Sequence, residues 1–503
     1  MAEMTSATKP EPTLSEPARS FLARQEFGLL IDGESGPAAS GESLETWDPS
    51  TGLPLARIAA GGAEDIDRAV KAARRAFEGS WRSWTAYDRQ ALLFRAHAVM
   101  GEHFQELAEI ESMDMGAPIA KTLAGKGPMQ RMIGFFAAQA LSVRGETTSN
   151  GFPGQVSTMT LRSPVGVVGG IIPWNGPLVA QWWILGAVLA TGCTAVIKPA
   201  EDASLSVLRV AELLHEIGLP PGVLNVVTGK GSIAGEALAS HDDVDRIAFT
   251  GSTETGRRII RASAGNIKKL QLELGGKSPD IVFADADLDK AVPGAANGVF
   301  NNSGQICFAG TRVLVQRAIV DQFAERVADF SRRLRVGRSL DPHAQLGPLI
   351  SERQLERVQG LIKAGIDEGA DLVAGSAARA EGVGDGYFLK PTVFSNVSND
   401  MTIAREEIFG PVMSIIPFDT AEEAIAIGNA TAYGLGGGVW TRDLSTALRV
   451  VEGIQSGVMW VNCYGLIDPL TGFTGSKSSG YGAKGTGAHL DTYLQTKSVY
   501  IQA

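Results

Sequence analysis

The stretch TAVIKPAEDASLSVLRVAELLHEIGLPPGVLNVVTG, residues 194–229, decides the fold. Its two ends are short apolar runs, and residues 204–218 repeat apolar positions at three- and four-residue spacing. This pattern predicts a strand, an amphipathic helix and a second strand. Apolar strands joined by a helix are typical of a parallel sheet that is covered on both faces. The stretch therefore predicts an α/β fold.

The same alternation extends on both sides of this stretch. Upstream, the sequence predicts helices over 63–78 and 88–114, a polar strand near 158, a turn at Ser163-Pro164 and then a buried strand. Downstream, a first α/β unit continues to about residue 265, and a second begins around Lys277 with a strand over 278–284. Two such units in tandem imply a cleft between them, and ligands bind where parallel strands end.

Composition narrows the class of protein. The chain has 503 residues, of which 44% are hydrophobic and 20% charged, and this balance is typical of a soluble multidomain protein. The net charge of −10 argues against nucleic acid or an anionic membrane as a partner. Three cysteines form no disulfide framework and no metal motif, which predicts a reducing, cytoplasmic compartment.

Two segments of the N-terminal half, residues 1–24 and residues 176–200, need separate interpretation. Residues 1–24 are predicted to be a disordered tail, because they are rich in Pro, Ser, Thr and Glu and lack an apolar core. Residues 176–200 are the most apolar part of the chain. Gly186 and Gly192 interrupt them, so a buried helix followed by a buried strand is expected there in place of a membrane span.

Two stretches of the first unit suit a dinucleotide. FTGSTETG, residues 249–256, joins a strand to a helix, and the N–H groups at the start of that helix can hold a phosphate. A capped turn is the alternative interpretation. IKPAE, residues 197–201, places Lys198 and Glu201 after a buried strand. A carboxylate there can accept both ribose hydroxyls, and a solvated charge pair is the alternative.

Three further stretches carry polar residues beside turns. Asn175 lies in IIPWNGP (171–177), and its alternative role is that of a turn residue that binds its own backbone. Glu273 lies in LELGGKSP (272–279), and it is either a solvated side chain or a base whose pKa is raised by burial. The acidic stretch EEIFGP (406–411) allows the same two interpretations.

Cys307 lies in NNSGQICFAGTR, residues 301–312, between a predicted helix ending at Gly304 and a strand over 311–316. Junctions of this kind present functional groups. The alternative role is that of a small buried hydrophobe, and this role is expected for Cys193 and Cys463, which lie in apolar runs.

Taken together, these stretches resemble the NAD(P)-dependent aldehyde dehydrogenase superfamily, from about Gly28 to the C-terminus. PWN, KPAE, FTGSTETG, LELGGKSP, GQICFAGTR, EEIFGPV and WVNCY occur in the family's order. The resemblance implies a doubly wound cofactor domain, a catalytic α/β domain and a small oligomerisation β-flap. The expected boundaries are residues 25–142 and 165–275 for the NAD-binding domain, 276–477 for the catalytic domain, and 143–164 with 488–503 for the flap.

The resemblance also implies the roles of the site residues. Cys307 would be the nucleophile, Glu273 the general base and Asn175 an oxyanion donor, together with the backbone N–H of Cys307. The aldehyde would pass through a thiohemiacetal and a thioester to the carboxylic acid. Gly251 and Ser252 would face the pyrophosphate, Lys198 and Glu201 the adenine ribose, and Glu407 with Phe409 the nicotinamide riboside. The cofactor site would further include Ile171, Pro173, Trp174, Gly231 and Leu274.

The chain departs from the family pattern at two places. Lys484 stands where many members have an acidic residue that has been given a proton-relay role, and Gly176 replaces a bulky aromatic after Asn175. The substrate tunnel would be bordered by apolar or small residues, namely Gly176, Trp182, Trp183, Ile306, Phe308 and Phe473. They predict a medium-sized hydrophobic or aromatic aldehyde as substrate, because no arginine or lysine is expected at the tunnel to hold a carboxylate-bearing semialdehyde.

Several alternatives stay open at this stage. A CoA-acylating enzyme is disfavoured by Glu273, and a structural protein of the same fold is disfavoured by the joint presence of Cys307, Glu273 and Asn175. A semialdehyde dehydrogenase is a further alternative. Glu201 favours NAD over NADP, although Lys198 could admit a 2′-phosphate. A homodimer or homotetramer is expected, with a small-molecule aldehyde as substrate and with neither nucleic acid nor membrane as a partner.

Overall fold

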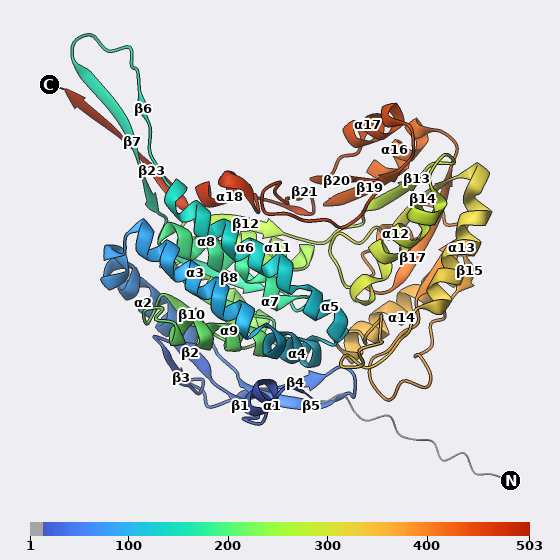
Figure 1. The fold of residues 1–503 in the computed structure, drawn as a ribbon, viewed down its shortest axis with the longest axis horizontal. Coiled ribbons are helices and arrows are strands. Elements are labelled where there is room, and N and C mark those ends of the chain that lie inside the picture. Colours follow the sequence, from blue (N-terminus) through green and yellow to red (C-terminus); the bar gives the residue numbers. More distant parts are fainter. Residues whose placement is uncertain (1–13, 503) are drawn as a thin grey trace.

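The computed structural model describes residues 14–502, which form two α/β bodies and a projecting β arm (Figure 1). The first body contains an eight-stranded sheet in the order β22-β12-β11-β8-β9-β10-β2-β3. Its five central strands are parallel, as the apolar strand pattern predicts, and its edge strands β22, β2 and β3 are antiparallel. The strands are β2 (Leu29–Ile31), β3 (Glu34–Gly36), β8 (Val167–Ile172), β9 (Thr194–Pro199), β10 (Leu224–Val226), β11 (Arg246–Thr250), β12 (Lys269–Glu273) and β22 (Gly480–Tyr481).

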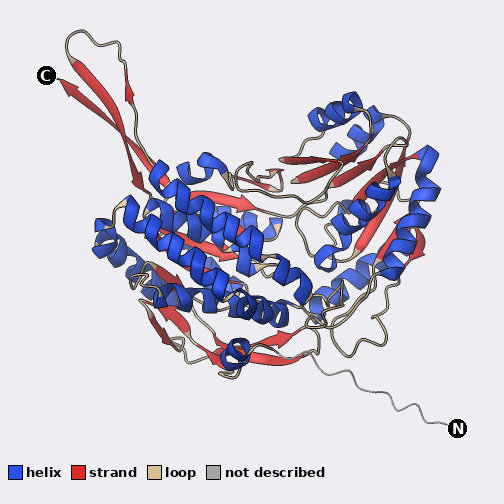
Figure 2. Cartoon of the chain, in the orientation of Figure 1, coloured by secondary structure: helices blue, strands red, loops and turns tan. Residues whose placement is uncertain are grey.

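Helices cover both faces of this sheet (Figure 2). Consecutive strand residues pack into two different hydrophobic clusters, since Ala195 and Ile197 face one cluster and Val196 faces the other. One face is covered by α3 (Ala86–Glu102), α4 (Phe104–Met115), α6 (Lys126–Gln139), α8 (Trp182–Thr191) and α9 (Leu205–Glu216). The other is covered by α2 (Ala63–Glu78), α10 (Glu236–Ser240) and α11 (Thr253–Ala262). The strand, helix and strand predicted from residues 194–229 are confirmed as β9, α9 and β10.

The second body has a seven-stranded sheet in the order β15-β16-β17-β14-β13-β19-β20, parallel except for β15 with β16. The strands are β13 (Pro279–Val282), β14 (Arg312–Gln316), β15 (Asp371–Ala374), β16 (Thr392–Ser395), β17 (Val412–Phe418), β19 (Gly436–Trp440) and β20 (Val458–Val461). One face is covered by α12 (Leu288–Phe300) and α13 (Val320–Arg333), and the other by α14 (Glu352–Asp367), α16 (Ala421–Asn429) and α17 (Leu444–Gly453). The predicted α/β fold is thus confirmed in both units.

The arm is a three-stranded antiparallel sheet in the order β23-β7-β6. It joins β6 (Thr147–Thr148) and β7 (Val156–Pro164) to the C-terminal strand β23 (Leu494–Gln502) and extends away from both bodies (Figure 1). Large apolar side chains on it are exposed, with Tyr500 65% and Leu161 50% accessible. The two ranges predicted to form a flap therefore lie side by side.

Shorter elements complete the chain. They are α5 (Ile119–Ala124), α7 (Pro177–Ala180), α15 (Thr402–Arg405), α18 (Thr486–Asp491), β18 (Tyr433–Gly434) and β21 (Ser476–Lys477). No helix within residues 14–502 is long and apolar enough to cross a membrane. The apolar stretch 176–200 instead forms α7, α8 and β9, as a buried helical segment followed by a strand.

The prediction of a disordered tail is wrong for residues 14–24, while residues 1–13 lie outside the described part of the chain. Residues Glu16–Leu22 form helix α1, and Phe21 and Leu22 are buried in the large core of the first body. The helix is followed by a small sheet that the sequence did not indicate, made of β1 (Glu26–Phe27), β5 (Leu53–Ala59) and β4 (Ser43–Asp48). The segment is mostly polar in composition, so its sequence did not indicate that its few apolar residues pack into the core of the first body.

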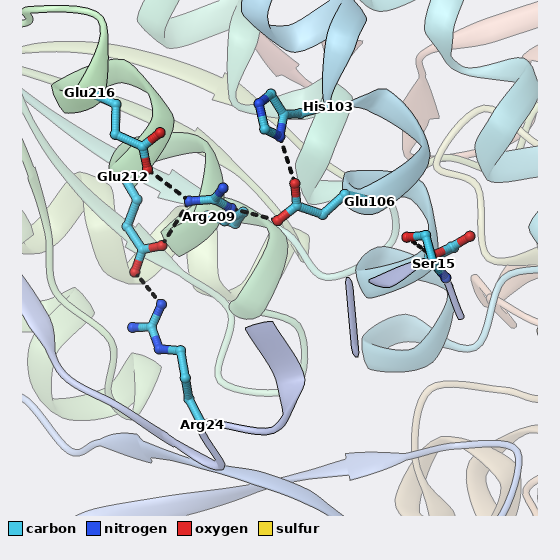
Figure 3. A network of polar contacts seen from close by, with 8 residues as sticks. Ser15, Arg24, His103, Glu106, Arg209, Glu212 and Glu216 are labelled. Carbon is cyan, nitrogen blue, oxygen red and sulfur yellow. Dashed lines mark hydrogen bonds and ion pairs between the residues drawn. The ribbon is translucent and has the colours of Figure 1, made fainter. Parts of the chain in front are cut away.

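A network of ion pairs connects Arg24 of the N-terminal segment with helices α9 and α4 (Figure 3). Arg24 pairs with Glu212 of α9 at 2.8 Å, and Glu212 pairs with Arg209 at 3.2 Å. Arg209 in turn reaches the buried Glu106 of α4 at 2.6 Å, and Glu106 contacts His103 at 2.7 Å. His103 is also where the single helix predicted over 88–114 breaks into α3 and α4.

Candidate active site

A cavity of about 890 Å³ opens between the two bodies. It lies at the carboxyl ends of β8, β11 and β12, where ligands of doubly wound sheets bind. Loops of the second body close its other side. Of the residues predicted for the site, it is lined by Pro173, Trp174, Asn175, Gly251, Ser252, Leu274, Cys307, Glu407 and Phe409.

The loop that carries Cys307 has an unusual backbone. Helix α12 ends at Phe300, not at Gly304 as the sequence predicts, because Asn302, Ser303 and Gly304 adopt left-handed φ values of 55°, 53° and 72°. Tertiary hydrogen bonds hold this turn, including one from Ser303 Oγ to the carbonyl of Gly347 at 2.7 Å. A Cβ at Gly304 would overlap the carbonyl of Gly410. The turn directs the half-buried thiol of Cys307 into the cavity.

The thiol of Cys307 is poorly ionised in this environment. Burial raises its pKa to about 12, and the carboxylates of Glu273 and Glu407 act in the same direction. Lys484 and the backbone N–H of Phe308 lower the pKa. A thiol of this kind needs a proton acceptor or an additional cation to become a nucleophile at neutral pH.

Asn175 follows β8 and reaches across to the Cys307 loop. Its Nδ2 donates to the carbonyl of Gln305 at 2.9 Å, and Asn302 Nδ2 donates back to the carbonyl of Asn175 at 3.2 Å. The start of α7 is anchored by the buried Glu111, which accepts the N–H of Leu178 at 2.6 Å. Asn175 therefore binds another segment and not its own turn, contrary to the alternative left open by the sequence.

Glu273 ends β12 and is only 2% exposed, so it is not a solvated side chain. Neither of its carboxylate oxygens has a hydrogen-bond partner among residues 14–502. Burial raises its pKa to about 7, and Lys484 partly opposes this shift. A buried carboxylate with a pKa near neutrality is suited to accept and return a proton.

The turn between β11 and α11 has the geometry of a phosphate site. Ser252 caps α11 by accepting the N–H of Thr255 at 3.2 Å, and Gly251 donates its N–H to the carbonyl of Glu273 at 3.0 Å. A Cβ at Gly251 would overlap the ring of Phe249, so this residue must stay small. The open helix start faces the cavity and can hold a negative group.

Lys198, Glu201 and Gly231 form a second group, outside the lining of the 890 Å³ cavity. Lys198 Nζ contacts Glu201 at 2.8 Å, and the N–H of Gly231 donates to the other carboxylate oxygen at 3.3 Å. Burial lowers the pKa of Lys198, while that of Glu201 falls because its buried carboxylate is paired with this lysine. The pair is therefore not the solvated pair that the sequence left open, since Lys198 is 2% exposed.

Glu407 and Phe409 line the opposite wall. Glu407 accepts the N–H of Gly276 at 3.0 Å, and burial raises its pKa to about 7. The Phe409 ring lies edge-on to Trp174, with 5.2 Å between the ring centroids. Ile171, the last predicted cofactor residue, is buried within β8 in the same hydrophobic cluster as Phe249 and Leu274, and it is not among the residues that line the cavity.

The predicted tunnel residues separate into two groups. Ile306 and Phe308 flank Cys307, Phe308 packs on Phe473 at 5.8 Å, and Gly176 follows Asn175. Trp183 is largely buried, and Trp182 is fully buried in the core of the first body. The prediction that Trp182 borders a tunnel is therefore wrong, because helical periodicity turns its side chain toward the core.

The structure adds residues that local sequence patterns did not indicate. The cavity is also lined by Thr250, Thr253, Glu254, Arg257, Gln354, Arg357, Arg405, Tyr433 and Ser478. Beside Cys307, Trp460 packs on Phe308 at 5.5 Å, and the Tyr464 hydroxyl donates to the Phe308 carbonyl at 2.7 Å. These residues come from helices, strands and loops that are far apart in the sequence, and the WVNCY stretch was the sole signal for the two aromatics.

Comparison with known proteins agrees with this geometry. The model of the aldehyde dehydrogenase family matches residues 37–499. A mitochondrial aldehyde dehydrogenase, family 2 member B4, from Arabidopsis thaliana is 46% identical over 475 residues, which cover 94% of this chain and 87% of that protein. A mitochondrial benzaldehyde dehydrogenase from Antirrhinum majus is 42% identical over 489 residues, which cover 97% and 91%.

Solved structures show the same relationship. The NAD+ complex of an aldehyde dehydrogenase from Bacillus cereus superposes with a TM-score of 0.94 at 42% identity, covering 97% of this chain and 99% of that one. The matches extend over both bodies and are not confined to single motifs. The chain therefore belongs to the aldehyde dehydrogenase family and is an enzyme that oxidises aldehydes with NAD+.

Proposed function

We propose that Cys307, Glu273 and Asn175 carry the reaction, converting an aldehyde and water to a carboxylic acid with NAD+ as oxidant. The observation that carries this assignment is their convergence. A thiol and an amide line one cavity, and an unpartnered buried carboxylate lies close enough to raise the pKa of that thiol. The three groups supply a nucleophile, an oxyanion donor and a base.

The first step is attack on the aldehyde carbon. Glu273 accepts the thiol proton of Cys307, directly or through a water, and the thiolate forms a bond to carbon. The aldehyde oxygen becomes an oxyanion. Asn175 has two amide N–H donors, of which one binds Gln305, so the second remains to stabilise the oxyanion together with the backbone N–H of Cys307.

The cavity fits a dinucleotide together with the group of Lys198, Glu201 and Gly231 that lies outside its lining. The open start of α11 suits the pyrophosphate, and Glu201 with the N–H of Gly231 suits the adenine ribose. Trp174, Leu274, Glu407 and Phe409 surround the end nearest Cys307. When bound there, the nicotinamide supplies a hydride acceptor.

The second half-reaction releases the product. Loss of hydride from the thiohemiacetal carbon leaves a thioester on Cys307. After Glu273 has released the thiol proton to solvent, it removes a proton from water and the resulting hydroxide adds to the thioester carbon. The carbon–sulfur bond then breaks, and Glu273 returns the proton to the departing thiolate. The acid leaves and the thiol is restored, so the buried base acts in both halves of the cycle.

The preferred substrate in this proposal is a hydrophobic aldehyde, including aromatic ones. Phe308, Phe473 and Trp460 form an aromatic group beside Cys307, and Gly176 leaves room next to Asn175. The similarity to a benzaldehyde dehydrogenase supports the same class. Glu201 supports NAD over NADP, because its carboxylate repels a 2′-phosphate.

The test is NADH formation by the purified enzyme with aromatic, long-chain aliphatic and carboxylate-bearing aldehydes, each with and without CoA. Turnover without CoA that is lost in Cys307→Ala is expected, with the highest kcat/KM for the apolar aldehydes. Full activity of Cys307→Ala would overturn the assignment of the nucleophile. A strong preference for succinate semialdehyde would overturn the substrate class, and dependence on CoA would favour the acylating reaction.

Assembly and location belong to the same proposal. The exposed apolar side chains of the arm, including Leu161 and Tyr500, support a homodimer or homotetramer built through β6, β7 and β23. The three unpaired cysteines support a cytoplasmic, reducing location. Light scattering of the purified enzyme tests the first point, since a monomeric mass would contradict it.

A further inference from the structure

Thr250 and Glu273 are direct neighbours at the ends of two parallel strands. The register of β11 with β12 pairs Thr250 with Glu273. Neighbouring strands are about 4.8 Å apart, and paired residues of parallel strands project to the same face. The hydroxyl of Thr250 and the carboxylate of Glu273 therefore lie side by side.

Lys484 reaches this pair from the C-terminal loop. Its backbone is fixed by two hydrogen bonds with Phe473, of 2.7 Å and 3.0 Å, and its Nζ donates to Thr250 Oγ1 at 3.1 Å. Strand β22 brings this loop alongside β12 and pairs Gly480 with Glu273. A Cβ at Gly480 would overlap the carbonyl of Leu272, so a glycine is needed for this close pairing. The ammonium is thus held near the unpartnered carboxylate of Glu273, whose pKa it lowers against the effect of burial.

Charged side chains shift the pKa values of both Cys307 and Glu273. Cys307 faces the carboxylates of Glu273 and Glu407, which raise its pKa, and Lys484, which lowers it. Glu273 faces Lys484, which lowers its pKa against the effect of burial. On the far side, Lys484 faces His489 of α18, whose pKa is lowered by burial, Arg246 and Lys484, so His489 is neutral.

We propose that Lys484 is a positioning residue whose ammonium, held on Thr250, keeps a fixed positive charge beside Cys307 and Glu273 and favours the anionic form of both. This inference rests on the proposed roles of those two residues. The charge is built into the chain, so it acts before cofactor binds and throughout the cycle. It therefore lowers the cost of forming the thiolate in the free enzyme and keeps the base ready for water.

The test measures the thiol itself, without aldehyde or NAD+. The rate of Cys307 alkylation by iodoacetamide is followed by peptide mass from pH 6 to 10 in the wild type and in Lys484→Met, Lys484→Gln and Lys484→Arg. In the Met and Gln variants we expect the rate at a given pH below the midpoint to fall by about tenfold, equivalent to a shift of about one pH unit toward higher pH. Lys484→Arg should restore the wild-type profile.

Two controls separate charge from structure. Lys484→Gln keeps a donor for Thr250 without the charge, so a wild-type profile in Gln with a shifted one in Met would overturn the proposal. Lys290→Met removes an exposed cation at the start of α12 and should leave the profile unchanged. Unshifted profiles in both neutral variants would also overturn it. Alkylation needs no turnover, so failure here is distinct from full activity of Cys307→Ala, which would overturn the proposed function.

Discussion

The side-chain amide of Asn175 donates a 2.9 Å hydrogen bond to the carbonyl oxygen of Gln305, two residues before Cys307. The bond connects the end of β8 in one body with the loop that carries Cys307 in the other. The distance between the Cys307 thiol and the Asn175 amide, its proposed oxyanion donor, is therefore set by how the two bodies dock. Glu111 supports this geometry by holding Leu178 at the start of α7.

Replacing Asn175 by Ala should lower kcat by roughly 10²–10³-fold, because one oxyanion donor is lost. KM for NAD+ should change little, since the amide is directed at the Cys307 loop. Steady-state kinetics with the best aldehyde measures the effect. A variant that keeps more than half of wild-type kcat would show that Asn175 holds the loop without serving the oxyanion.

Glu273→Gln should form its first equivalent of NADH per active site more slowly than the wild type and should then nearly stop, because Cys307 lacks its proton acceptor and the thioester lacks a base for hydrolysis. Rapid-mixing absorbance at 340 nm and mass spectrometry of the intact protein would detect the burst and the acyl adduct. The neutral amide keeps the shape of the carboxylate, so a normal steady-state rate in this variant would exclude Glu273 as the base.

The hydrolytic rate should depend on pH through Glu273. Burial raises its pKa to about 7, and a base acts only when deprotonated, so kcat should be low below pH 7 and should rise to a plateau above it. A pH profile of kcat measures this, with the pH-stability range checked by preincubation. The rise should be absent from the residual activity of Glu273→Gln.

Gly304→Ala should destabilise the nucleophile loop by about 1–3 kcal/mol, because Gly304 has φ +72° and a Cβ would overlap the Gly410 carbonyl. Since Gly410 follows Phe409, NAD+ binding should weaken as well. Thermal unfolding and a KM measurement test this. Gly360→Ala is the matched control: this helical glycine has open space around it, and its replacement should stabilise α14 by up to about 1 kcal/mol.

Glu201→Gln should raise kcat/KM for NADP+ relative to NAD+ by roughly tenfold, equivalent to 1.4 kcal/mol. The substitution removes the charge that repels a 2′-phosphate and frees Lys198 from its 2.8 Å pair. The ratio of the two kcat/KM values, measured with one aldehyde, gives the result. An unchanged ratio would mean that the 2′ position does not face Glu201.

Much of the fold could be predicted because its elements are encoded locally. The helix over 63–78 and the strand over 194–199 match the structure, since each depends on periodicity within a short window. The errors have a nonlocal cause. Helix α1 is held by apolar contacts with distant residues, and α12 stops at Phe300 because the following turn is fixed by Gly347 and Gly410.

The candidate active site shows the same difference between features that local sequence encodes and features that depend on distant contacts. The chemistry-bearing residues could be found one by one, because Cys307, Glu273 and Asn175 stand in distinctive stretches beside turns. The cations Arg257, Arg357 and Arg405 could not, since they lie on helices whose local patterns are ordinary. Trp182 was misplaced because sequence proximity to Asn175 does not show which side of a helix faces the core.

By itself, the sequence determined the alternation of strands and helices, the order of the motifs and the kinds of reactive group, all of which follow from local residue patterns. The tertiary structure alone decided how those groups behave. Burial sets the pKa of Glu273 near 7 and that of Cys307 near 12, and the pairing of β22 with β12 brings the loop of Lys484 close enough to lower both pKa values. Desolvation and charge separation depend on packing between segments far apart in the chain, and no local pattern records them.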